Sequence, residues 1–250
     1  MNFKGKVAIV TGAGGGIGEG YAKALAEQGC AVAVADINEG GAARVADTII
    51  AAGGKATAVK ADVSSEASVI EMAANVSESF GGIDYLINNA AIYGGMQLHS
   101  MTDVPYEYWR RFMSVNVDGC FLATRAVVPH MQKRGGGAIV NQSSSAAWLS
   151  RAGYYGIAKL ALNGITQNFA TELGPKKIRV NAIAPGPTDT EATRTSTAEG
   201  LVDSIVSTLP LSRIGVLKDM SDALLFLLSD QASWITGQIL CVDGGFIMRP

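Results

Sequence analysis

A short apolar strand that leads directly into a cluster of glycines constrains the fold more than any other feature of the sequence. Residues 7–11 read Val-Ala-Ile-Val-Thr, and five glycines follow within the next seven residues. Bare backbone at such a turn lets a pyrophosphate approach closely, and the amino terminus of the following helix favours its negative charge. The spacing Gly-x-x-x-Gly-x-Gly, over Gly12, Gly16 and Gly18, is a variant of the general dinucleotide fingerprint. A plain glycine-rich turn is the alternative, and the position after the first strand favours a dinucleotide site.

Strand-like apolar runs and helical patterns alternate along the rest of the chain. The runs predict strands at Lys6–Val10, Ala31–Ala35, Ala56–Ala61, Tyr85–Asn88, Ala138–Gln142, Ile178–Ile183 and Gln238–Val242. The patterns predict helices at Ile17–Gln28 and Ala42–Ala52, a helix that begins at Ser65 and ends before Gly81-Gly82, and helices at about Val104–Lys133, at Tyr154–Leu173 and at Ser221–Leu228. Such alternation is typical of an open, doubly wound parallel sheet. The hydrophobic content of 48% and the charged content of 17% suit a sheet buried on both faces.

No change in composition marks a domain boundary. We therefore expect residues 1–250 to form a single α/β domain, a Rossmann-like doubly wound parallel sheet of about seven strands with helices on both faces. The least regular stretch is residues 187–213, which contain Thr, Ser, Glu and Gly with little periodicity. A long loop in a compact domain is typical of a lid over a substrate site.

Tyr155 and Lys159 stand four residues apart within the helix predicted for residues 154–173. Residues with this spacing share one helix face. An ammonium about 4 Å away, at an effective dielectric near 20, would lower the tyrosine pKa from about 10 to as little as about 7. Such a tyrosine can take a proton from an alcohol or return one to a carbonyl. The alternative is a surface helix with two solvated side chains, so the interpretation depends on the other motifs.

Asp36 closes the second predicted strand, 18 residues after Gly18. A carboxylate there can accept hydrogen bonds from both ribose hydroxyls of an adenosine and would repel a 2′-phosphate. No Arg or Lys lies between Gly12 and Gly18 or directly after Asp36 to neutralise that phosphate. The pattern therefore favours NAD over NADP. Asp36 could instead cap the next helix, but Asn38 is better placed for that role.

Charge and composition exclude several other classes. The net charge is −2 and no basic block suggests nucleic acid or a membrane surface as a partner. There is no apolar run of membrane length and no signal-peptide core at the start. The three cysteines are widely spaced and are expected to be reduced thiols of a cytoplasmic protein. Because His99 and His130 are the only histidines, neither a metal site nor a Ser-His-Asp triad is predicted.

Taken together, the motifs resemble the short-chain dehydrogenase/reductase family along essentially the whole chain. The resemblance is carried by residues 11–18, Asp62-Val63, Asn88-Asn89-Ala90-Ala91, Asn116, Ser144, Tyr155, Lys159, Pro185-Gly186-Pro187-Thr188, and residues 235–238 and 242–245. It implies an alcohol dehydrogenase or carbonyl reductase that interconverts a secondary alcohol and a ketone by hydride transfer. It also implies a homotetramer, paired through the two long helices and the last strand.

The resemblance also implies a role for each site residue. Tyr155 would act as general acid/base, Lys159 would lower its pKa and hold the nicotinamide ribose, and Ser144 would donate a hydrogen bond to the substrate oxygen. Asn116 would hold a water that links Lys159 to solvent. The cofactor-binding residues expected on this basis are Gly12, Gly15, Gly16, Ile17, Gly18, Asp36, Ile37, Asp62, Val63, Asn89, Ala90, Tyr155, Lys159, Pro185, Gly186, Thr188 and Thr190.

The sequence departs from the family pattern at two places. Ala91 replaces the usual glycine, which would slightly alter the backbone approach to the ribose side. Ser144 precedes Tyr155 by eleven residues, where the family more often has about thirteen. Ser144 is favoured as the catalytic serine because it ends the predicted strand, and Ser143 is the alternate.

The substrate wall is less clear from the sequence. Tyr93, Ala146, Trp148 and Tyr154 flank the expected catalytic centre and suggest a largely apolar wall for a small or medium neutral alcohol or ketone. Trp148 and Tyr154 could equally be packing residues.

Two other functions remain open at this point. The first 12 residues also resemble an NADPH-dependent 3-oxoacyl-carrier-protein reductase, which would need a basic docking patch. Lys133-Arg134 is a thin candidate for that patch, and Asp36 opposes the cofactor. A non-catalytic nucleotide-binding scaffold on the same fold is the second alternative. It is disfavoured because all four catalytic positions are filled.

Overall fold

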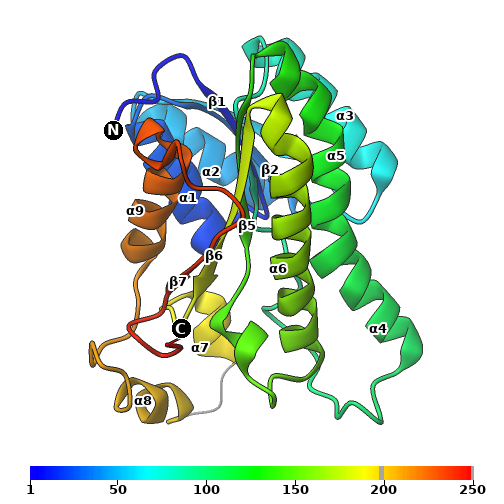
Figure 1. The fold of residues 1–250 in the computed structure, drawn as a ribbon, viewed down its shortest axis with the longest axis vertical. Coiled ribbons are helices and arrows are strands. Elements are labelled where there is room, and N and C mark those ends of the chain that lie inside the picture. Colours follow the sequence, from blue (N-terminus) through cyan, green and yellow to red (C-terminus); the bar gives the residue numbers. More distant parts are fainter. Residues whose placement is uncertain (197–199, 249–250) are drawn as a thin grey trace.

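The computed structural model describes residues 1–196 and 200–248, and within these residues seven parallel strands form one sheet (Figure 1). The strands are β1 (Val7–Thr11), β2 (Ala31–Asp36), β3 (Lys55–Lys60), β4 (Tyr85–Asn88), β5 (Gly137–Gln142), β6 (Ile178–Pro185) and β7 (Ile239–Val242). Their spatial order is β3-β2-β1-β4-β5-β6-β7, and every neighbouring pair is parallel. The predicted single-domain, Rossmann-like sheet is confirmed.

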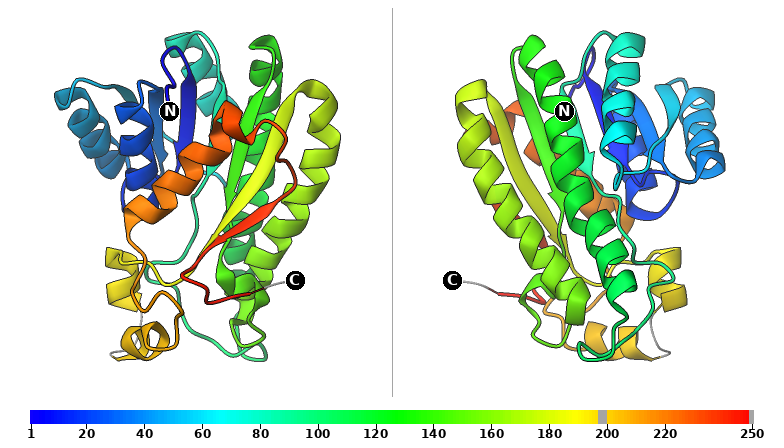
Figure 2. Two further views of the ribbon diagram at one scale, coloured as in Figure 1. Left: turned by 60° about the vertical axis from the view of Figure 1, so that its left-hand side comes forward. Right: turned by 90° about the vertical axis from the view of Figure 1, so that its right-hand side faces the viewer.

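Helices cover both faces of the sheet (Figure 2). They are α1 (Gly16–Glu27), α2 (Glu39–Ala51), α3 (Glu66–Phe80), α4 (Tyr106–Met113), α5 (Gly119–Lys133), α6 (Gly153–Leu173), α7 (Glu191–Ser196), α8 (Leu201–Val206) and α9 (Leu217–Leu228). Successive residues of a strand point to opposite faces. Accordingly Ala8 and Val10 of β1 pack in the core under α1, α2 and α9, while Val7 and Ile9 pack in the core under α3, α5 and α6. Burial on both faces explains why the strands read as continuous apolar runs.

Two stretches differ from the sequence-based expectation. The helix predicted over residues 104–133 is divided by a single π-helical turn, η1 (Ser114–Asp118), which joins α4 to α5. The irregular stretch 187–213 contains the short helices α7 and α8, which are too short to show periodicity. Part of that predicted lid, residues 197–199, lies outside the described residues. None of the described helices combines the length and apolar character needed to cross a membrane.

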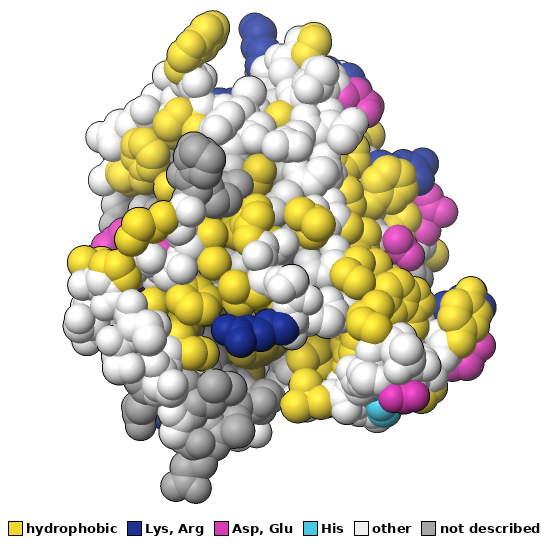
Figure 3. Space-filling model, turned by 60° about the horizontal axis from the view of Figure 1, so that its bottom comes forward, with side chains coloured by type: hydrophobic (Ala, Val, Ile, Leu, Met, Phe, Trp, Pro, Cys, Tyr) yellow, Lys and Arg dark blue, Asp and Glu magenta, His cyan; other side chains and the backbone are white. Residues whose placement is uncertain are grey.

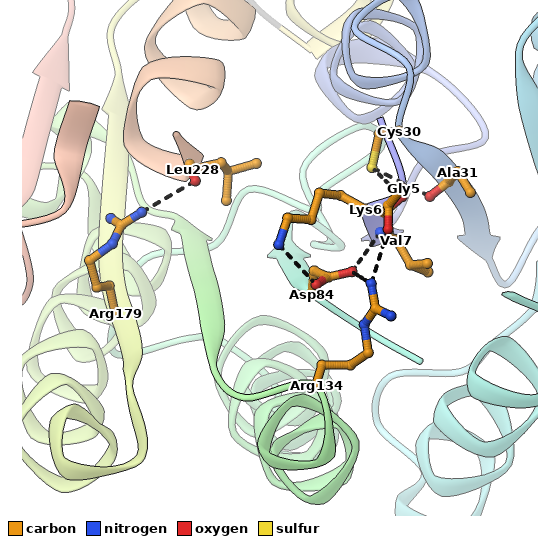
Figure 4. Close-up of polar contacts among 9 residues, drawn as sticks. All are labelled: Gly5, Lys6, Val7, Cys30, Ala31, Asp84, Arg134, Arg179 and Leu228. Atoms are coloured by element: carbon orange, nitrogen blue, oxygen red, sulfur yellow. Dashed lines mark hydrogen bonds and ion pairs between the residues drawn. The ribbon is translucent and has the colours of Figure 1, made fainter. Parts of the chain in front are cut away.

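A buried carboxylate ties the amino-terminal edge of the sheet together (Figure 4). Asp84, only 3% exposed, accepts hydrogen bonds from the Val7 amide at 2.9 Å, from Lys6 Nζ at 3.3 Å and from Arg134 Nη2 at 2.9 Å. Arg134 also donates to the Gly5 carbonyl. This cluster joins the start of β1 to the start of β4 and to the end of α5. The cluster lies at the amino-terminal ends of the strands, away from the glycine loop at their carboxyl ends, so its role is to stabilise the fold.

We predict that Asp84→Ala destabilises the protein by about 2–4 kcal/mol, because it leaves a buried amide and two cations without their shared acceptor. Urea denaturation would measure the loss. Asp222→Ala is the matched control, since it breaks only an exposed pair with Lys218 worth at most about 1 kcal/mol. Equal stability losses in the two variants would contradict the assigned role.

Candidate active site

The site lies at the carboxyl ends of the strands, where the strand order reverses between β1 and β4. This switch point is where ligands bind in open α/β sheets. The glycine loop follows β1, and Asn88-Asn89-Ala90 ends β4 and follows it. A cavity of about 790 Å³ opens here, lined by both segments, by the amino-terminal part of α6 and by α7 and α8.

Most of the predicted site residues line this single cavity. The predicted cofactor residues along it are Gly12, Gly15, Gly16, Ile17, Asp36, Ile37, Asp62, Val63, Asn89, Ala90, Tyr155, Lys159, Pro185, Gly186, Thr188 and Thr190. Gly18 is the exception and lies beneath the loop. A Cβ added at Gly18 would be 2.2 Å from the Gly12 carbonyl oxygen, so its glycine serves close packing between helix and loop.

The glycine loop packs tightly against the segment that follows β4 on one side and is open to the cavity on the other. Gly12 has φ +63°, and a Cβ there would be 2.6 Å from the Cα of Ala90. The Asn89 amide donates to the carbonyls of Thr11 and Gly12 at 3.0 and 2.9 Å. By contrast, nothing lies within 4 Å of a Cβ added at Gly15 or Gly16, at the amino terminus of α1. This open, donor-rich end fits a pyrophosphate.

Asp36 is oriented by two backbone amides at the end of β2. Its carboxylate oxygens accept from Gly14 N and from Asn38 N, each at 2.8 Å. Asn38 in turn accepts from Gly41 N and caps α2, as expected. Asp36 is therefore not the helix cap, and its carboxylate lines the cavity.

Arg44, which sequence reasoning missed, lies over the glycine loop. It comes from α2 and donates to the Gly14 carbonyl at 2.9 Å. Its guanidinium is paired with both carboxylate oxygens of Glu19, at 2.7 and 3.2 Å. No Arg or Lys lies within the loop or directly after Asp36, as the sequence showed, but α2 brings Arg44, eight residues after Asp36, back to the loop. That cation is already neutralised by Glu19.

Tyr155, Lys159 and Ser144 meet at the centre of the cavity. Lys159 Nζ is 5.7 Å from the centroid of the Tyr155 ring and donates to the Gln142 carbonyl at 2.7 Å. Ser144 accepts from the Ala146 amide at 3.1 Å, and its hydroxyl lies near enough to the Tyr155 phenol to lower the pKa of that group. Ser144 follows the end of β5, and Tyr155 and Lys159 lie in the first and second turns of α6.

Burial controls the protonation of the pair. It raises the pKa of Tyr155 well above its ordinary range, and the hydrogen bond with Ser144 lowers it by less. The expected lowering by Lys159 is not found in the cofactor-free protein, because the ammonium is bonded to a carbonyl and not to the phenol. Burial also lowers the pKa of Lys159 from about 10.5 to about 8.

The two candidate serines have different surroundings. Ser143 is 2% exposed, and its hydroxyl lies 2.7 Å from Asn163 Oδ1 and 3.2 Å from the Lys159 carbonyl. Ser144 is half-buried and lies beside the phenol. This arrangement favours Ser144, because the hydroxyl of Ser143 is engaged in holding α6 against β5.

Asn116 lies in the π-helical turn η1 and is buried. Its Nδ2 donates to the Phe112 carbonyl at 2.9 Å. Its Oδ1 is the only buried side-chain N or O atom among the described residues without a hydrogen-bond partner. Buried acceptors are normally satisfied, so this atom fits a bound water. π-helical turns of this kind are frequent at functional sites.

The structure brings only two of the four residues predicted for the substrate wall to the cavity. Tyr93 and Ala146 line the cavity, and the Tyr93 ring lies 5.3 Å from that of Tyr155. Tyr154 does not line it, because its ring packs against Phe112 and its hydroxyl donates to the Gln97 carbonyl. Trp148 is also absent from the lining. The other residues that complete the substrate side, which sequence reasoning did not select, include Ile92, Leu149, Val202, Ile205, Phe246, Arg111 and Arg151.

A doubly wound sheet that places a glycine loop beside a Tyr-x-x-x-Lys pair defines the class of dinucleotide-dependent oxidoreductases. A family model described as enoyl-(acyl carrier protein) reductase matches residues 12–247. An oxidoreductase of Mycobacterium tuberculosis is 61% identical over 247 residues, 99% of each chain. The chain belongs to the short-chain dehydrogenase/reductase family, as the motifs indicated.

Relatives with specific names are more distant. The 7α-hydroxysteroid dehydrogenase of Escherichia coli is 38% identical over 251 residues, 100% of this chain and 97% of its own. A 7α-hydroxysteroid dehydrogenase structure with NADH and 7-oxo glycochenodeoxycholic acid has a TM-score of 0.92 at 38% identity, covering 98% of this chain and 95% of that chain. Cyclohexanol dehydrogenase of an Acinetobacter strain is 37% identical over 249 residues, 99% of this chain and 97% of its own.

The burial of Lys159 predicts a pH-dependent stability. Near pH 7 its charge is buried at a cost of up to about 3 kcal/mol, since its folded pKa is about 8 and its unfolded pKa about 10.5. We predict that Lys159→Met stabilises the cofactor-free protein by about 1–2 kcal/mol at pH 7, the lost bond to Gln142 offsetting part of the gain.

The advantage of Lys159→Met should shrink as pH rises from 8 to 10.5, because the wild-type lysine then becomes neutral in the folded state. Chemical denaturation at several pH values would measure it. Lys133→Met, at an exposed position, is the control and should show no such trend. A difference in unfolding free energy between Lys159→Met and the wild type that stays constant over this pH range would refute the buried charge.

Proposed function

We propose that the protein is an NAD-dependent oxidoreductase that interconverts a secondary alcohol and a ketone, with Tyr155 as general acid/base. The observation that carries this proposal is the meeting of Tyr155, Ser144 and Lys159 in one cavity with the glycine loop. When bound, the nicotinamide would accept or supply the hydride. The remaining chemistry is proton transfer and orientation by the chain itself.

Each side chain has a task that suits its surroundings. Tyr155, whose pKa is raised by burial, is a neutral phenol near pH 7 and can donate a proton to a ketone oxygen. Ser144 can donate a hydrogen bond to the same oxygen as negative charge develops on it. Lys159 is within reach of a ribose and of the phenol. The unpartnered Oδ1 of Asn116 would hold the water that connects Lys159 to solvent.

The choice of NAD over NADP rests on the end of β2. The Asp36 carboxylate lines the cavity where an adenosine ribose would lie, and a 2′-phosphate would be repelled there. Arg44 contacts the loop at the Gly14 carbonyl, and both carboxylate oxygens of Glu19 already accept from its guanidinium. The complex of the 7α-hydroxysteroid dehydrogenase with NADH agrees with this choice.

The substrate would be an alcohol or ketone carried on a ring. The lid and wall are mostly apolar, with Met96, Leu149, Val202, Ile205 and Phe246 among the lining residues. Two relatives are named for cyclic alcohols, a hydroxysteroid and cyclohexanol. These observations support a ring-bearing secondary alcohol.

A 3-oxoacyl-carrier-protein reductase is less well supported. It would use NADPH, which Asp36 opposes. The docking patch predicted for it, Lys133-Arg134, does not line the cavity, whose exposed basic residues are Arg111 and Arg151. Arg134 instead pairs with Asp84 at the opposite edge of the sheet (Figure 4). A non-catalytic scaffold is disfavoured because the four catalytic positions are filled and three of them converge in one cavity.

We also propose a cytoplasmic homotetramer. Apolar side chains that would be covered in such an assembly are exposed on α5, α6 and β7 and on the segment before β7. They are Phe121, Ile157, Leu160, Leu240 and Trp234, of which Trp234 is 99% exposed. Such faces are typical of subunit contacts.

We predict that Tyr155→Phe lowers turnover of secondary alcohols by roughly 10²–10⁴-fold, the range expected for loss of a general acid/base. NAD affinity should stay near normal. NADH absorbance measures turnover, and a fluorescence titration measures binding. The neighbouring Tyr154→Phe, outside the cavity lining, should keep most of the turnover. Wild-type turnover in Tyr155→Phe would sink the assignment.

We predict that Asp36→Ala raises the Kd of NAD by about 10- to 100-fold, since two hydrogen bonds to a charged acceptor are lost. The Kd of NADP should change little or fall. Asp47→Ala removes an exposed carboxylate from α2 outside the cavity and is the control. If the ratio of the Kd of NADP to the Kd of NAD is the same in Asp36→Ala as in the wild type, the proposed contact between Asp36 and the ribose is refuted.

A further inference from the structure

Two arginines in the cavity lining have no assigned task. Arg111 comes from α4, and Arg151 comes from the loop between β5 and α6. Both are exposed at the cavity mouth. Figure 3 shows basic side-chain atoms at the centre of this end of the molecule, ringed by hydrophobic side chains, with acidic side chains toward the edge.

These two guanidiniums are also the only ones without a partner among the described residues. Each of the other seven described arginines contacts a carboxylate, a backbone carbonyl or an aromatic ring. The contacts are those of Arg44, Arg110, Arg125, Arg134, Arg179, Arg194 and Arg213. Among the described residues, the two arginines without a partner are therefore the same two that line the cavity.

Charge is distributed unevenly along the cavity. Its acidic lining residues, among those described, are Asp36 and Asp62, at the ends of β2 and β3 on the adenosine side. Around Tyr155 the charged lining residues are Lys159 and the two arginines. A negatively charged group would therefore be disfavoured at one end of the cavity and favoured at the other.

Arg151 has the clearer position of the two arginines. It lies four positions before Tyr155, so their Cα atoms are at most about 14 Å apart. Leu149 and Ala152, on the same short loop, also line the cavity. A group bound by Arg151 would therefore belong to the molecule whose alcohol carbon lies at Tyr155, and apolar wall would separate the two.

We propose that the substrate is an amphipathic ring alcohol or ketone that carries a carboxylate, and that Arg151 recognises this carboxylate with help from Arg111. The proposal rests on the proposed function and refines it. It revises the expectation of a neutral substrate, which the sequence favoured because the residues expected to form the substrate wall are largely apolar. Planar guanidinium matches carboxylate with two parallel hydrogen bonds. Relatives include both kinds of substrate, an acid in the steroid complex and neutral cyclohexanol, and the arginines favour the acid.

The test compares each acid with its own methyl ester. Chenodeoxycholate and 4-hydroxycyclohexanecarboxylate, with their methyl esters, would be assayed as NAD-dependent substrates. The wild type should prefer the acid in kcat/KM by about tenfold, the lower end for a hydrogen bond to a charged group at an exposed site. Because the arginines are exposed, this preference should fall as salt is added.

Variants then assign the preference to residues. Arg151→Gln should reduce the acid-to-ester ratio to near unity, mainly through the KM of the acid, and Arg111→Gln should reduce it partially. Arg110→Gln is the matched control, because this neighbour of Arg111 lies over the Tyr106 ring and outside the cavity lining. A wild type that treats acid and ester alike, or a ratio that survives in the double variant, would overturn the proposal.

A binding measurement separates this inference from the proposed reaction. If no probe is oxidised, the reaction proposed above fails for these rings, and thermal shift of the NAD-loaded protein still tests recognition. The acid should then raise Tm more than its ester in the wild type, and the difference should vanish in Arg151→Gln. Equal shifts for acid and ester in the wild type would count against carboxylate recognition.

Discussion

The absence of a side chain at Gly18 is the constraint on which the site depends. With only hydrogen there, α1 approaches the Gly12 carbonyl closely enough that any Cβ would overlap it, and Asn89 can reach the same carbonyl from the end of β4. This contact packs α1, the glycine loop and the end of β4 together at the switch point of the sheet. It leaves the amino terminus of α1 open above, where Gly15 and Gly16 expose bare backbone. The cofactor site therefore depends on close packing of three segments, the glycine loop, α1 and the end of β4, around the carbonyl oxygen of Gly12.

Burial has opposite consequences for the two members of the catalytic pair. It favours the neutral form of each, which raises the pKa of Tyr155 and lowers that of Lys159. The site therefore holds a protonated phenol near pH 7 beside an ammonium whose pKa, about 8, lies below the ordinary value for lysine. Ionisation of the phenol needs further stabilisation, which Ser144 supplies in part. The cost of a buried charge near pH 7 is an example of stability exchanged for activity.

How much the sequence could predict follows from which interactions are local. Apolar runs, the cap at Asn38 and the glycine loop depend on neighbouring residues, and the doubly wound parallel sheet was predicted from them. The π-helical turn at Asn116 was not predicted, because one extra residue in a turn barely alters helical periodicity. Arg44 was missed because α2 returns it to the loop from outside any motif. The position of Tyr154 could not be predicted either: neighbours on a helix face different sides, and only packing against Phe112 shows which side is buried.

The charges of the cavity can serve orientation as well as affinity. Carboxylates at the ends of β2 and β3 make the electrostatic potential negative at the adenosine end of the cavity. Guanidiniums make it positive around the mouth. A dinucleotide bound as proposed would place its uncharged ribose hydroxyls at Asp36 and its pyrophosphate at the helix terminus, and would therefore fit in one direction only. An anionic substrate entering beside Arg151 would be repelled from the adenosine end and turned with its apolar ring toward Tyr155. The same asymmetry would then discriminate against a 2′-phosphate and align the reacting carbon, which are separate tasks performed by one field.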